Sequence, residues 1–182
     1  MLNLWQIQQE AALAEKNPVI MMSTSKGNIR IELDRVNAPI TTKNFVDYVS
    51  AGHYDGPIFH RVIPGFMIQG GGMDAELNEK KNQSPIKNEA ANGLKNNLGT
   101  IAMARTNMVD SATSQFFINL KNNDFLNHRS AAPAEFGYAV FGQVIEGMDV
   151  VHNIEKVRTG NKGGHQDVPV DAVTINSAKI ES

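Results

Sequence analysis

The sequence predicts a mainly β fold, either a barrel or a sandwich, covered by two helices. Eight short segments carry the composition or the alternation of β-strands, whereas only two segments of the main body have helical spacing. No repeat in which strands alternate with helices is visible, which argues against a parallel sheet. Several strand segments contain Gly or Pro, as closed antiparallel sheets often do at their corners.

The expected strands begin at residue 19. Residues 28–33 place isoleucine or leucine at every second position, with Arg30 and Glu32 between them, and this period of two predicts a half-buried strand. Residues 19–23 precede it, and the turn residues 25–28 predict that the two strands form a hairpin. The eight expected strands are 19–23, 28–33, 58–63, 66–69, 99–104, 115–120, 138–144 and 172–180.

Two amphipathic helices are expected. The first spans about residues 39–51, where Phe45, Tyr48 and Val49 lie at i, i+3 and i+4. The second spans about residues 148–156, where valine and isoleucine side chains form one stripe. Each helix has one apolar face, so each is expected to lie over an open end of the sheet.

Residues 1–17 are expected to form an extension outside a single domain at residues 18–182. This stretch mixes leucine, isoleucine and alanine with three glutamines, and it contains no glycine before Pro18. It is therefore predicted to be helical or frayed and to stop before the proline. Trp5 could dock on the domain or stay loose, and both arrangements remain open.

The composition indicates a globular chain and argues against several functional classes. Lys and Arg number 17 against 19 Asp and Glu, which leaves a net charge of −2 without the positive excess of a nucleic-acid binder. No cysteine is present, so disulfides, thiolate nucleophiles and zinc–thiolate sites are excluded. No apolar run approaches the roughly 20 residues that span a bilayer. We therefore expect neither nucleic acid nor membrane as a partner.

The N-terminus predicts a cytoplasmic protein. It lacks the basic start and the apolar run of an export signal. Residues Ala12, Leu13 and Ala14 match the A-x-A pattern of a cleavage site. A periplasmic protein whose upstream signal has been removed is therefore the alternative.

Two long connections, residues 70–98 and 121–137, are polar and rich in asparagine. Ordered loops of this length usually carry function. Simple surface insertions explain them about equally well.

The sequence offers no metal or cofactor motif. Its five histidines form no tight ligand pair, and no carboxylate lies at a zinc-like spacing from them. The triple glycine at 70–72 is followed by Met73 and Asp74, whereas a phosphate loop would continue with lysine and Ser or Thr. A tight backbone turn that only glycine allows is the favoured explanation. We expect no cofactor and no metal.

The most informative stretch is FHRVIPGFMIQGGG. It places Arg61 in the middle of a predicted strand, where a plain core would carry an apolar side chain. Met67 and Gln69 share one face of the next strand. Gln115 and Phe117 share one face of a later strand. These common faces predict a groove with an apolar floor and a few fixed donors, and a buried arginine satisfied by carbonyl groups is the alternative.

Five motifs follow one another along the chain, namely FHRVIPGFMIQGGG, GTIAMART, SATSQFFINL, NDFLN and GYAVFG. In this order they resemble the cyclophilins, the peptidyl-prolyl cis–trans isomerases, and most closely the bacterial type. The resemblance extends over residues 19–180. It implies a closed eight-stranded antiparallel barrel capped by two α-helices. It also implies an enzyme that rotates Xaa–Pro peptide bonds and assists protein folding.

The resemblance implies roles for individual residues of this chain. Arg61 takes the catalytic position, and Gln69 helps to hold that arginine and the substrate. The pocket for the substrate proline falls on Phe66, Met67, Phe117 and Leu126. The remaining substrate-binding positions are His60, Ala104, Arg105, Thr106, Gln115, Phe125 and Tyr138. His60 lies inside a predicted strand, where a hydrogen-bonded structural histidine is the favoured interpretation.

The chain departs from the eukaryotic members of this family at three positions and resembles bacterial members there. Phe125 replaces a tryptophan, Tyr138 replaces a histidine and Arg105 replaces an asparagine. Because the indole N–H donor is missing at Phe125, tight binding of cyclosporin is in doubt, and we expect weak binding.

The expected partners are proline-containing peptides and unfolded or flexible protein segments, and a monomer is expected. No bond breaks during the isomerisation, so the reaction needs no nucleophile. A non-catalytic chaperone that binds proline peptides in the same groove is the alternative function. A barrel that holds a small lipophilic ligand is disfavoured, because Arg61, Gln69 and Gln115 would place polar groups in its cavity.

Overall fold

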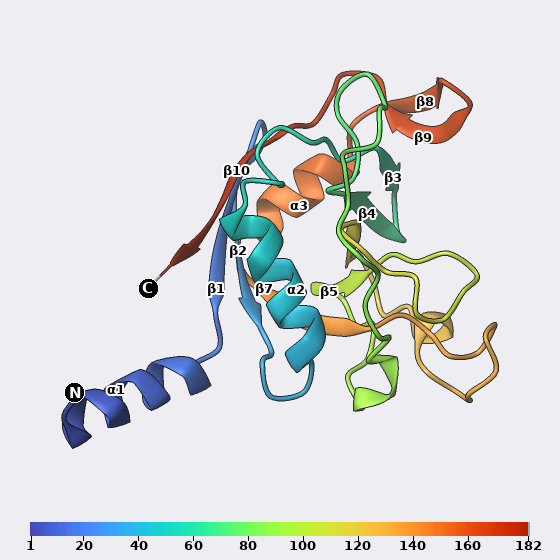
Figure 1. The fold of residues 1–182 in the computed structure, drawn as a ribbon. Helices are drawn as coiled ribbons and strands as arrows, with labels where there is room; N and C mark the ends of the chain where they lie inside the picture. The colour runs from blue at the N-terminus through green and yellow to red at the C-terminus, as the bar shows by residue number, and fades with distance from the viewer. Residues whose placement is uncertain (182) are drawn as a thin grey trace.

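The computed structural model describes residues 1–181, with the side chains of residues 12–15 left undescribed. Its main feature is one antiparallel sheet of eight strands, which curls around a hydrophobic interior (Figure 1). The strands are β1 (Val19–Thr24), β2 (Gly27–Leu33), β3 (Arg61–Ile63), β4 (Met67–Gly70), β5 (Thr100–Met103), β6 (Phe116–Asn119), β7 (Val140–Glu146) and β10 (Ile175–Glu181). Each of the eight expected strand segments overlaps one of these strands, so the mainly β class is confirmed.

The prediction of a closed barrel is wrong, because the sheet stays open between its two edge strands. The strand order is β10-β1-β2-β7-β5-β6-β4-β3, and β3 does not form a ladder with β10. The edges meet through the residues in front of β3, where backbone hydrogen bonds of 2.8 to 2.9 Å join residues 56–59 to residues 173–175 around a bridge between Ile58 and Thr174. This contact does not continue as a ladder between β3 and β10, because β3 is short, and the expected strand 58–63 is reduced to Arg61–Ile63.

Two helices cover the sheet, as the sequence predicts. Helix α2 (Pro39–Ser50) contacts β10, and α3 (Met148–Glu155) contacts β2, β3 and β4. The start of α2 is held by a distant carboxylate, because Glu89 Oε1 accepts hydrogen bonds from the N–H of Thr41 at 2.6 Å and from its hydroxyl at 2.7 Å. A carboxylate at this position satisfies free N–H groups of the first helical turn.

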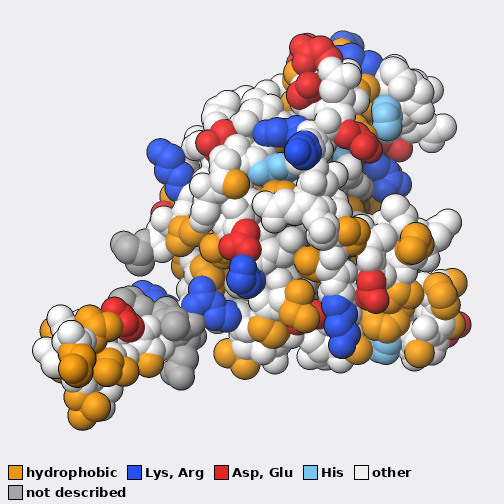
Figure 2. Space-filling view, in the orientation of Figure 1, with side chains coloured by type: hydrophobic (Ala, Val, Ile, Leu, Met, Phe, Trp, Pro, Cys, Tyr) orange, Lys and Arg blue, Asp and Glu red, His pale blue; other side chains and the backbone are white. Residues whose placement is uncertain are grey.

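A third helix, α1 (Leu4–Glu15), extends away from the sheet (Figure 1). Asn3 and Gln6 cap its start, each accepting a hydrogen bond from the backbone N–H of the other at 2.8 to 2.9 Å. Trp5 is 64% exposed, so of the two arrangements left open by the sequence the structure has the undocked one. Figure 2 shows the hydrophobic side chains gathered on this helix. No helix in the described part of the chain is long and apolar enough to cross a bilayer.

The sequence gives little sign of the hairpin formed by β8 (Thr159–Lys162) and β9 (His165–Pro169). Most of its residues are polar, and they lack the alternation of apolar side chains that predicts a strand. Its turn contains Gly163 and Gly164, both with a positive φ angle that favours glycine. The hairpin lies beside β3 and lengthens that side of the molecule (Figure 1).

Strands β4, β5 and β6 and the first three residues of β7 are largely buried on both faces, and this arrangement creates the candidate site. Successive residues point to opposite faces of a strand. On β6, Phe116 points into the main core inside the curled sheet, whereas Phe117 joins a second hydrophobic cluster. The buried members of this second cluster are Met67, Ala102, Phe117, Leu126 and Val140.

Candidate active site

A cavity of about 160 Å³ opens over the second hydrophobic cluster, and we call it the cup. Strands β4 and β6 form its floor, where Gln69 pairs with Phe117 across the ladder. For scale, an engineered protein cavity of about 150 Å³ holds a benzene ring, so the cup is large enough for a five-membered ring. Its lining residues are Arg61, Phe66, Met67, Gln69, Ala104, Arg105, Phe117, Leu126 and Tyr138.

The apolar part of the cup is preformed by packed side chains. Met67, Phe117 and Leu126 are only 2%, 4% and 8% exposed. The ring of Tyr138 meets Phe117 edge-on at 5.7 Å between ring centroids, a favourable aromatic geometry. Leu126 comes from a short 3-10 helix, η2 (Asp124–Leu126), in the long connection 121–137, so that connection contributes to the candidate site.

Arg61 lies at the rim of the cup and is connected to two glutamines. Its Nη1 donates to Gln69 Oε1 at 3.4 Å, and Gln69 Nε2 donates to Gln115 Oε1 at 2.9 Å. We call these three residues the glutamine relay. Since a guanidinium group only donates hydrogen bonds, the bond to Gln115 turns the oxygen of the Gln69 amide towards Arg61. The guanidinium is exposed, so the alternative of a buried arginine satisfied by carbonyls does not describe Arg61.

The glycines after β4 permit this close packing. A Cβ atom added at Gly72 would lie 2.3 Å from Cγ of Gln115, and one at Gly71 would lie 2.7 Å from the ring of Phe116. Gly71 also has a φ of +91°, which other residues rarely adopt. The triple glycine therefore serves close approach as well as a backbone turn, and no feature of a phosphate site is needed to explain it.

Arg105 is the arginine whose donors are satisfied by carbonyl groups. Its guanidinium donates to the carbonyl oxygens of Gly137 at 3.0 Å, Thr106 at 2.9 Å and Pro133 at 3.0 Å. It also lies 5.0 Å from the ring centroid of Tyr138, within cation–π range. The side chain thus ties the 133–138 segment to the wall of the cup.

Two further cavities adjoin the cup and share Arg105 with it. One, of about 260 Å³, brings in Gln115 and Thr106. The other, of about 320 Å³, brings in Phe125, whose ring lies 5.6 Å from that of Phe66 between centroids. Apart from His60, every expected site residue therefore lines the cup or one of these two adjoining cavities.

His60 lies outside this arrangement. It is 5% exposed and lines none of the described cavities, and its Nδ1 has no hydrogen-bond partner. The expectation of a hydrogen-bonded structural histidine is therefore wrong for Nδ1. Burial lowers the pKa of His60 from 6.5 to about 4, and the nearby charges of His165 and Arg61 act in the same direction.

This burial predicts a loss of stability in mild acid. Between pH 6.5 and about 4, the unfolded chain binds a proton at His60 that the folded chain excludes, so the free energy of unfolding falls as the pH falls. At about 1.4 kcal/mol for each pKa unit, the loss is about 3 kcal/mol. Urea unfolding at pH 7 and pH 4 measures it, and His60→Leu is expected to remove this part of the difference. An unchanged difference in the variant would contradict the assignment to His60.

Sequence reasoning missed a contact that supports the loop between Arg61 and Phe66. Glu155 on α3 accepts a hydrogen bond from the N–H of Gly65 at 2.7 Å, and His152 Nδ1 lies 3.0 Å from its other oxygen. Partial burial acts to raise the pKa of Glu155, but the Gly65 and His152 bonds outweigh it and lower the pKa. Ninety residues separate the partners of the main contact, so no local pattern could predict it.

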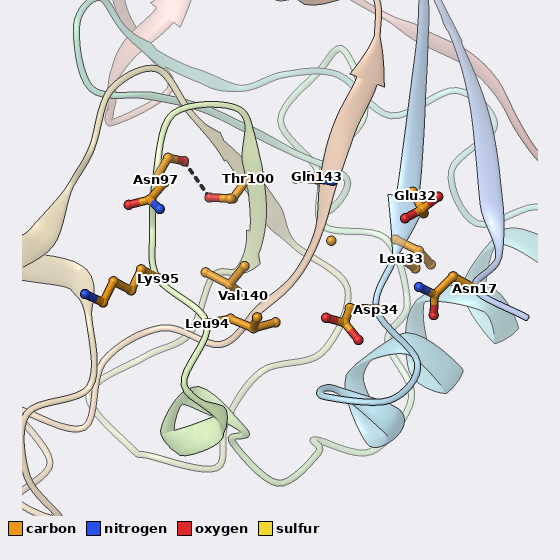
Figure 3. Close-up of a pocket in the computed structure, with 11 residues that line it drawn as sticks. Asn17, Glu32, Leu33, Asp34, Leu94, Lys95, Asn97, Thr100, Val140 and Gln143 are labelled. Atoms are coloured by element: carbon orange, nitrogen blue, oxygen red, sulfur yellow. Dashed lines mark hydrogen bonds between the residues drawn. The ribbon is translucent and has the colours of Figure 1, made fainter. Parts of the chain in front are cut away.

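A separate groove of about 260 Å³ lies near the start of β1, between the ends of β2, β5 and β7 (Figure 3). Its lining is mostly polar, with Asp34 and Asn17 on one side and Lys95 and Asn97 on the other. Among the side chains that the structure describes, no group of three or more His, Asp or Glu is placed to hold a metal. The cup, with its apolar floor and fixed donors, is therefore the candidate site.

Comparison with known proteins agrees with this choice. The family model described as "Cyclophilin type peptidyl-prolyl cis-trans isomerase/CLD" matches residues 19–180. A peptidyl-prolyl cis-trans isomerase of Streptomyces antibioticus is 58% identical over 88% of this chain and 97% of its own length. Peptidyl-prolyl cis-trans isomerase B of Escherichia coli is 51% identical over 89% of this chain and 99% of its own length.

Solved structures agree as well. A crystal structure of a Cryptosporidium parvum cyclophilin type peptidyl-prolyl cis-trans isomerase matches with a TM-score of 0.74 at 26% identity, over 91% of this chain and 98% of that one. A second structure of the same protein, determined in the presence of the dipeptide Ala-Pro, also gives a TM-score of 0.74 at 26% identity, over 90% of this chain and 99% of that one.

Proposed function

The chain belongs to the cyclophilin family and is a peptidyl-prolyl cis-trans isomerase, and on that premise we propose that the cup binds the substrate proline while Arg61 assists rotation of the preceding peptide bond. The observation that carries this proposal is the position of an exposed guanidinium at the rim of a small apolar cavity. Gln69 and Gln115 hold this guanidinium through the glutamine relay.

The chemistry of the peptide bond explains why these groups suit the reaction. An Xaa–Pro bond rotates over a barrier of about 20 kcal/mol, because the nitrogen lone pair is delocalised into the carbonyl group. In the twisted state the nitrogen regains its lone pair and can accept a hydrogen bond. A donor that meets this lone pair stabilises the twisted state more than either planar form, and so lowers the barrier.

Arg61 supplies this donor, and the cup holds the ring. A hydrogen bond from a charged group contributes about 1.5–3 kcal/mol, and each 1.4 kcal/mol changes a rate about tenfold. Met67, Phe117 and Leu126 exclude water from the ring, which strengthens the field of the guanidinium. The proline ring stays fixed while the preceding carbonyl swings.

The substrates are proline-containing peptides and flexible protein segments. One of the adjoining cavities extends the cup past Ala104, Thr106 and Gln115, where these residues can contact the peptide main chain. Arg105 is engaged by carbonyls of its own chain, so its part is to shape this wall rather than to bind substrate. The expected monomer and the expected cytoplasmic location stay predictions.

Two-dimensional NMR exchange on an Ala-Pro peptide tests the proposed function. Catalytic amounts of the protein are expected to produce exchange cross-peaks between the cis and trans forms, which otherwise interconvert over tens of seconds or longer. Titration of labelled protein is expected to shift the signals of Phe66, Met67 and Phe117. Exchange with shifts confined to the groove beside Asn17 would contradict the assignment of the cup.

Cyclosporin binding is expected to be weak and to improve when an indole N–H is added. Phe125 is 61% exposed and stacks near Phe66, so a tryptophan fits at this position without repacking the core. Phe125→Trp is expected to lower the inhibition constant by about fivefold, since one hydrogen bond contributes about 1 kcal/mol. Phe125→Tyr is the aromatic control. If cyclosporin inhibits the tryptophan variant no better, the missing donor is not the cause.

A further inference from the structure

Three buried asparagines lie behind the cup and bond to one another. Asn119, at the end of β6, donates from Nδ2 to Asn96 Oδ1 at 3.0 Å and to Thr100 Oγ1 at 2.9 Å, while its Oδ1 accepts from Asn123 Nδ2 at 2.8 Å. All three asparagines are fully buried. We call Asn96, Asn119 and Asn123 the asparagine network.

The network ends on the backbone of three residues that line the cup. Asn123 Nδ2 donates to the carbonyl oxygen of Phe66 at 2.9 Å. Asn96 Nδ2 lies 3.3 Å from the carbonyl oxygens of both Leu126 and Tyr138. Phe66, Leu126 and Tyr138 come from three separate parts of the chain, so no single strand or helix fixes their relative positions.

We propose that the asparagine network consists of positioning residues for the isomerase: by bonding to the carbonyls of Phe66, Leu126 and Tyr138, it sets the shape of the cup. The proposal rests on the proposed function, because it takes the cup to be the proline site. None of the three asparagines lines the cup, so they act through its walls rather than on substrate.

The chemistry of the amide group explains why asparagine suits this task. Each side chain carries two N–H donors and one acceptor oxygen. Each amide can therefore accept a hydrogen bond from one asparagine and donate to the next, and the last amide can donate to a backbone carbonyl. Buried donors and acceptors that lose their partners destabilise a fold by about 1–3 kcal/mol each. Displacing one wall of the cup would break such bonds, and the network therefore resists displacement. Asn123 makes both of these hydrogen bonds through Nδ2, and its Oδ1 has no partner in the described part of the chain.

The network reaches the polar groove through Thr100. Thr100 Oγ1 accepts the bond from Asn119 and donates to the carbonyl of Asn97 at 2.7 Å, which Figure 3 shows as a dashed line. At this bond the network reaches the protein surface, in the polar groove and not in the cup. The side chains that bond to Asn119 are all uncharged, so a carboxyl group placed there would titrate without a nearby ion pair.

The substitution Asn119→Asp tests the proposal through the pH dependence of peptide binding. A protonated aspartic acid can accept from Asn123 and donate to Asn96, but its single O–H cannot also replace the bond to Thr100. An ionised carboxylate cannot donate, and it places an oxygen against Asn96 Oδ1. Burial raises the pKa of a carboxyl group from about 4 by up to about 3–5 units. The group is therefore expected to be protonated at pH 5 and to ionise as the pH rises towards 8.

We expect the dissociation constant of an Ala-Pro peptide to rise about tenfold between pH 5 and pH 8 in Asn119→Asp, and to stay within about twofold in the wild type. The titration is done well below the unfolding temperature, and circular dichroism verifies that the variant is folded. A merely structural role would lower the melting temperature and leave this affinity ratio unchanged. A flat pH profile in the folded variant would overturn the proposal.

A second variant keeps the test decisive where Asn119→Asp does not fold. Asn123→Ala removes the donor to Phe66 and is expected to weaken peptide binding about tenfold. Ile20→Val, in the core at β1, is the matched control, because it costs about 0.5–1.5 kcal/mol of stability without touching the cup. Equal affinities of the two variants would overturn the proposal. If the wild type itself fails to bind the peptide, the proposed function fails instead.

Discussion

Replacing Arg61 with alanine is expected to lower kcat/KM for a proline peptide by about 10- to 150-fold, because one charge-assisted hydrogen bond of about 1.5–3 kcal/mol to the twisted amide is lost. The guanidinium is exposed, and it donates one long hydrogen bond of 3.4 Å to Gln69. Its removal is therefore expected to leave the melting temperature nearly unchanged. A protease-coupled isomerase assay and a thermal melt measure both effects.

Two further variants separate charge from geometry at this position. Arg61→Lys keeps the charge but loses the planar fork that can bond to Gln69 and to substrate at once, so an intermediate rate is expected. Arg158→Ala removes another exposed arginine that lines none of the described cavities and is expected to keep the wild-type rate. Full activity in Arg61→Ala would rule out the catalytic role.

The strands could be predicted because each is short and alternates locally. The sequence 28–33 shows this most clearly, and the structure has β2 there with alternate residues buried. The failure of closure could not be predicted, since it depends on how far β3 runs beside a strand more than 100 residues away. The hairpin of β8 and β9 could not be predicted, because its strands pair through backbone groups and carry mostly polar side chains without an apolar alternation.

The residues of the candidate site could be predicted where two of them lie on the same face of one strand. Met67 with Gln69, and Gln115 with Phe117, reach the same region because residues two apart share a face. Side chains that act through backbone carbonyls leave no such pattern. Arg105 bonds to the carbonyls of a later loop, and a carbonyl has the same chemistry whichever residue carries it. The resemblance also includes His60, which the structure buries away from the cup.

The position of the cup on the sheet explains how one fold keeps both a core and a site. The interior of the curled sheet is filled by packed side chains, among which the ring centroid of Phe45 lies 5.6 Å from that of Phe116 and 5.2 Å from that of Phe141. The cup is formed on the opposite face from the alternate residues of the same strands. A substitution on β6 therefore affects either the core or the site, depending on which face its side chain meets.

This separation predicts that two phenylalanine substitutions lower stability to a similar extent but differ in their effect on peptide binding. Phe117→Ala is expected to lower the free energy of unfolding by about 3–5 kcal/mol, as other buried phenylalanines do, and also to weaken binding of an Ala-Pro peptide by tenfold or more, about 1.4 kcal/mol or above. Phe59→Ala, whose side chain lies in the main core, is expected to cost similar stability but to leave the affinity of the folded protein unchanged.

Separate measurements of kcat and KM distinguish the role of the cup from that of the guanidinium. In the proposed mechanism Phe117 holds the proline ring in every state of the reaction, so its loss is expected to raise KM more than it lowers kcat. Arg61 is proposed to act mainly on the twisted amide, so its loss is expected to lower kcat with little change in KM. Peptide titrations and full kinetic curves on Phe117→Leu, which retains more of the packing, guard against unfolding of the alanine variant. If Phe117→Leu and Arg61→Ala change kcat and KM in the same proportion, the proposal that Phe117 binds the ring while Arg61 acts on the amide nitrogen is wrong.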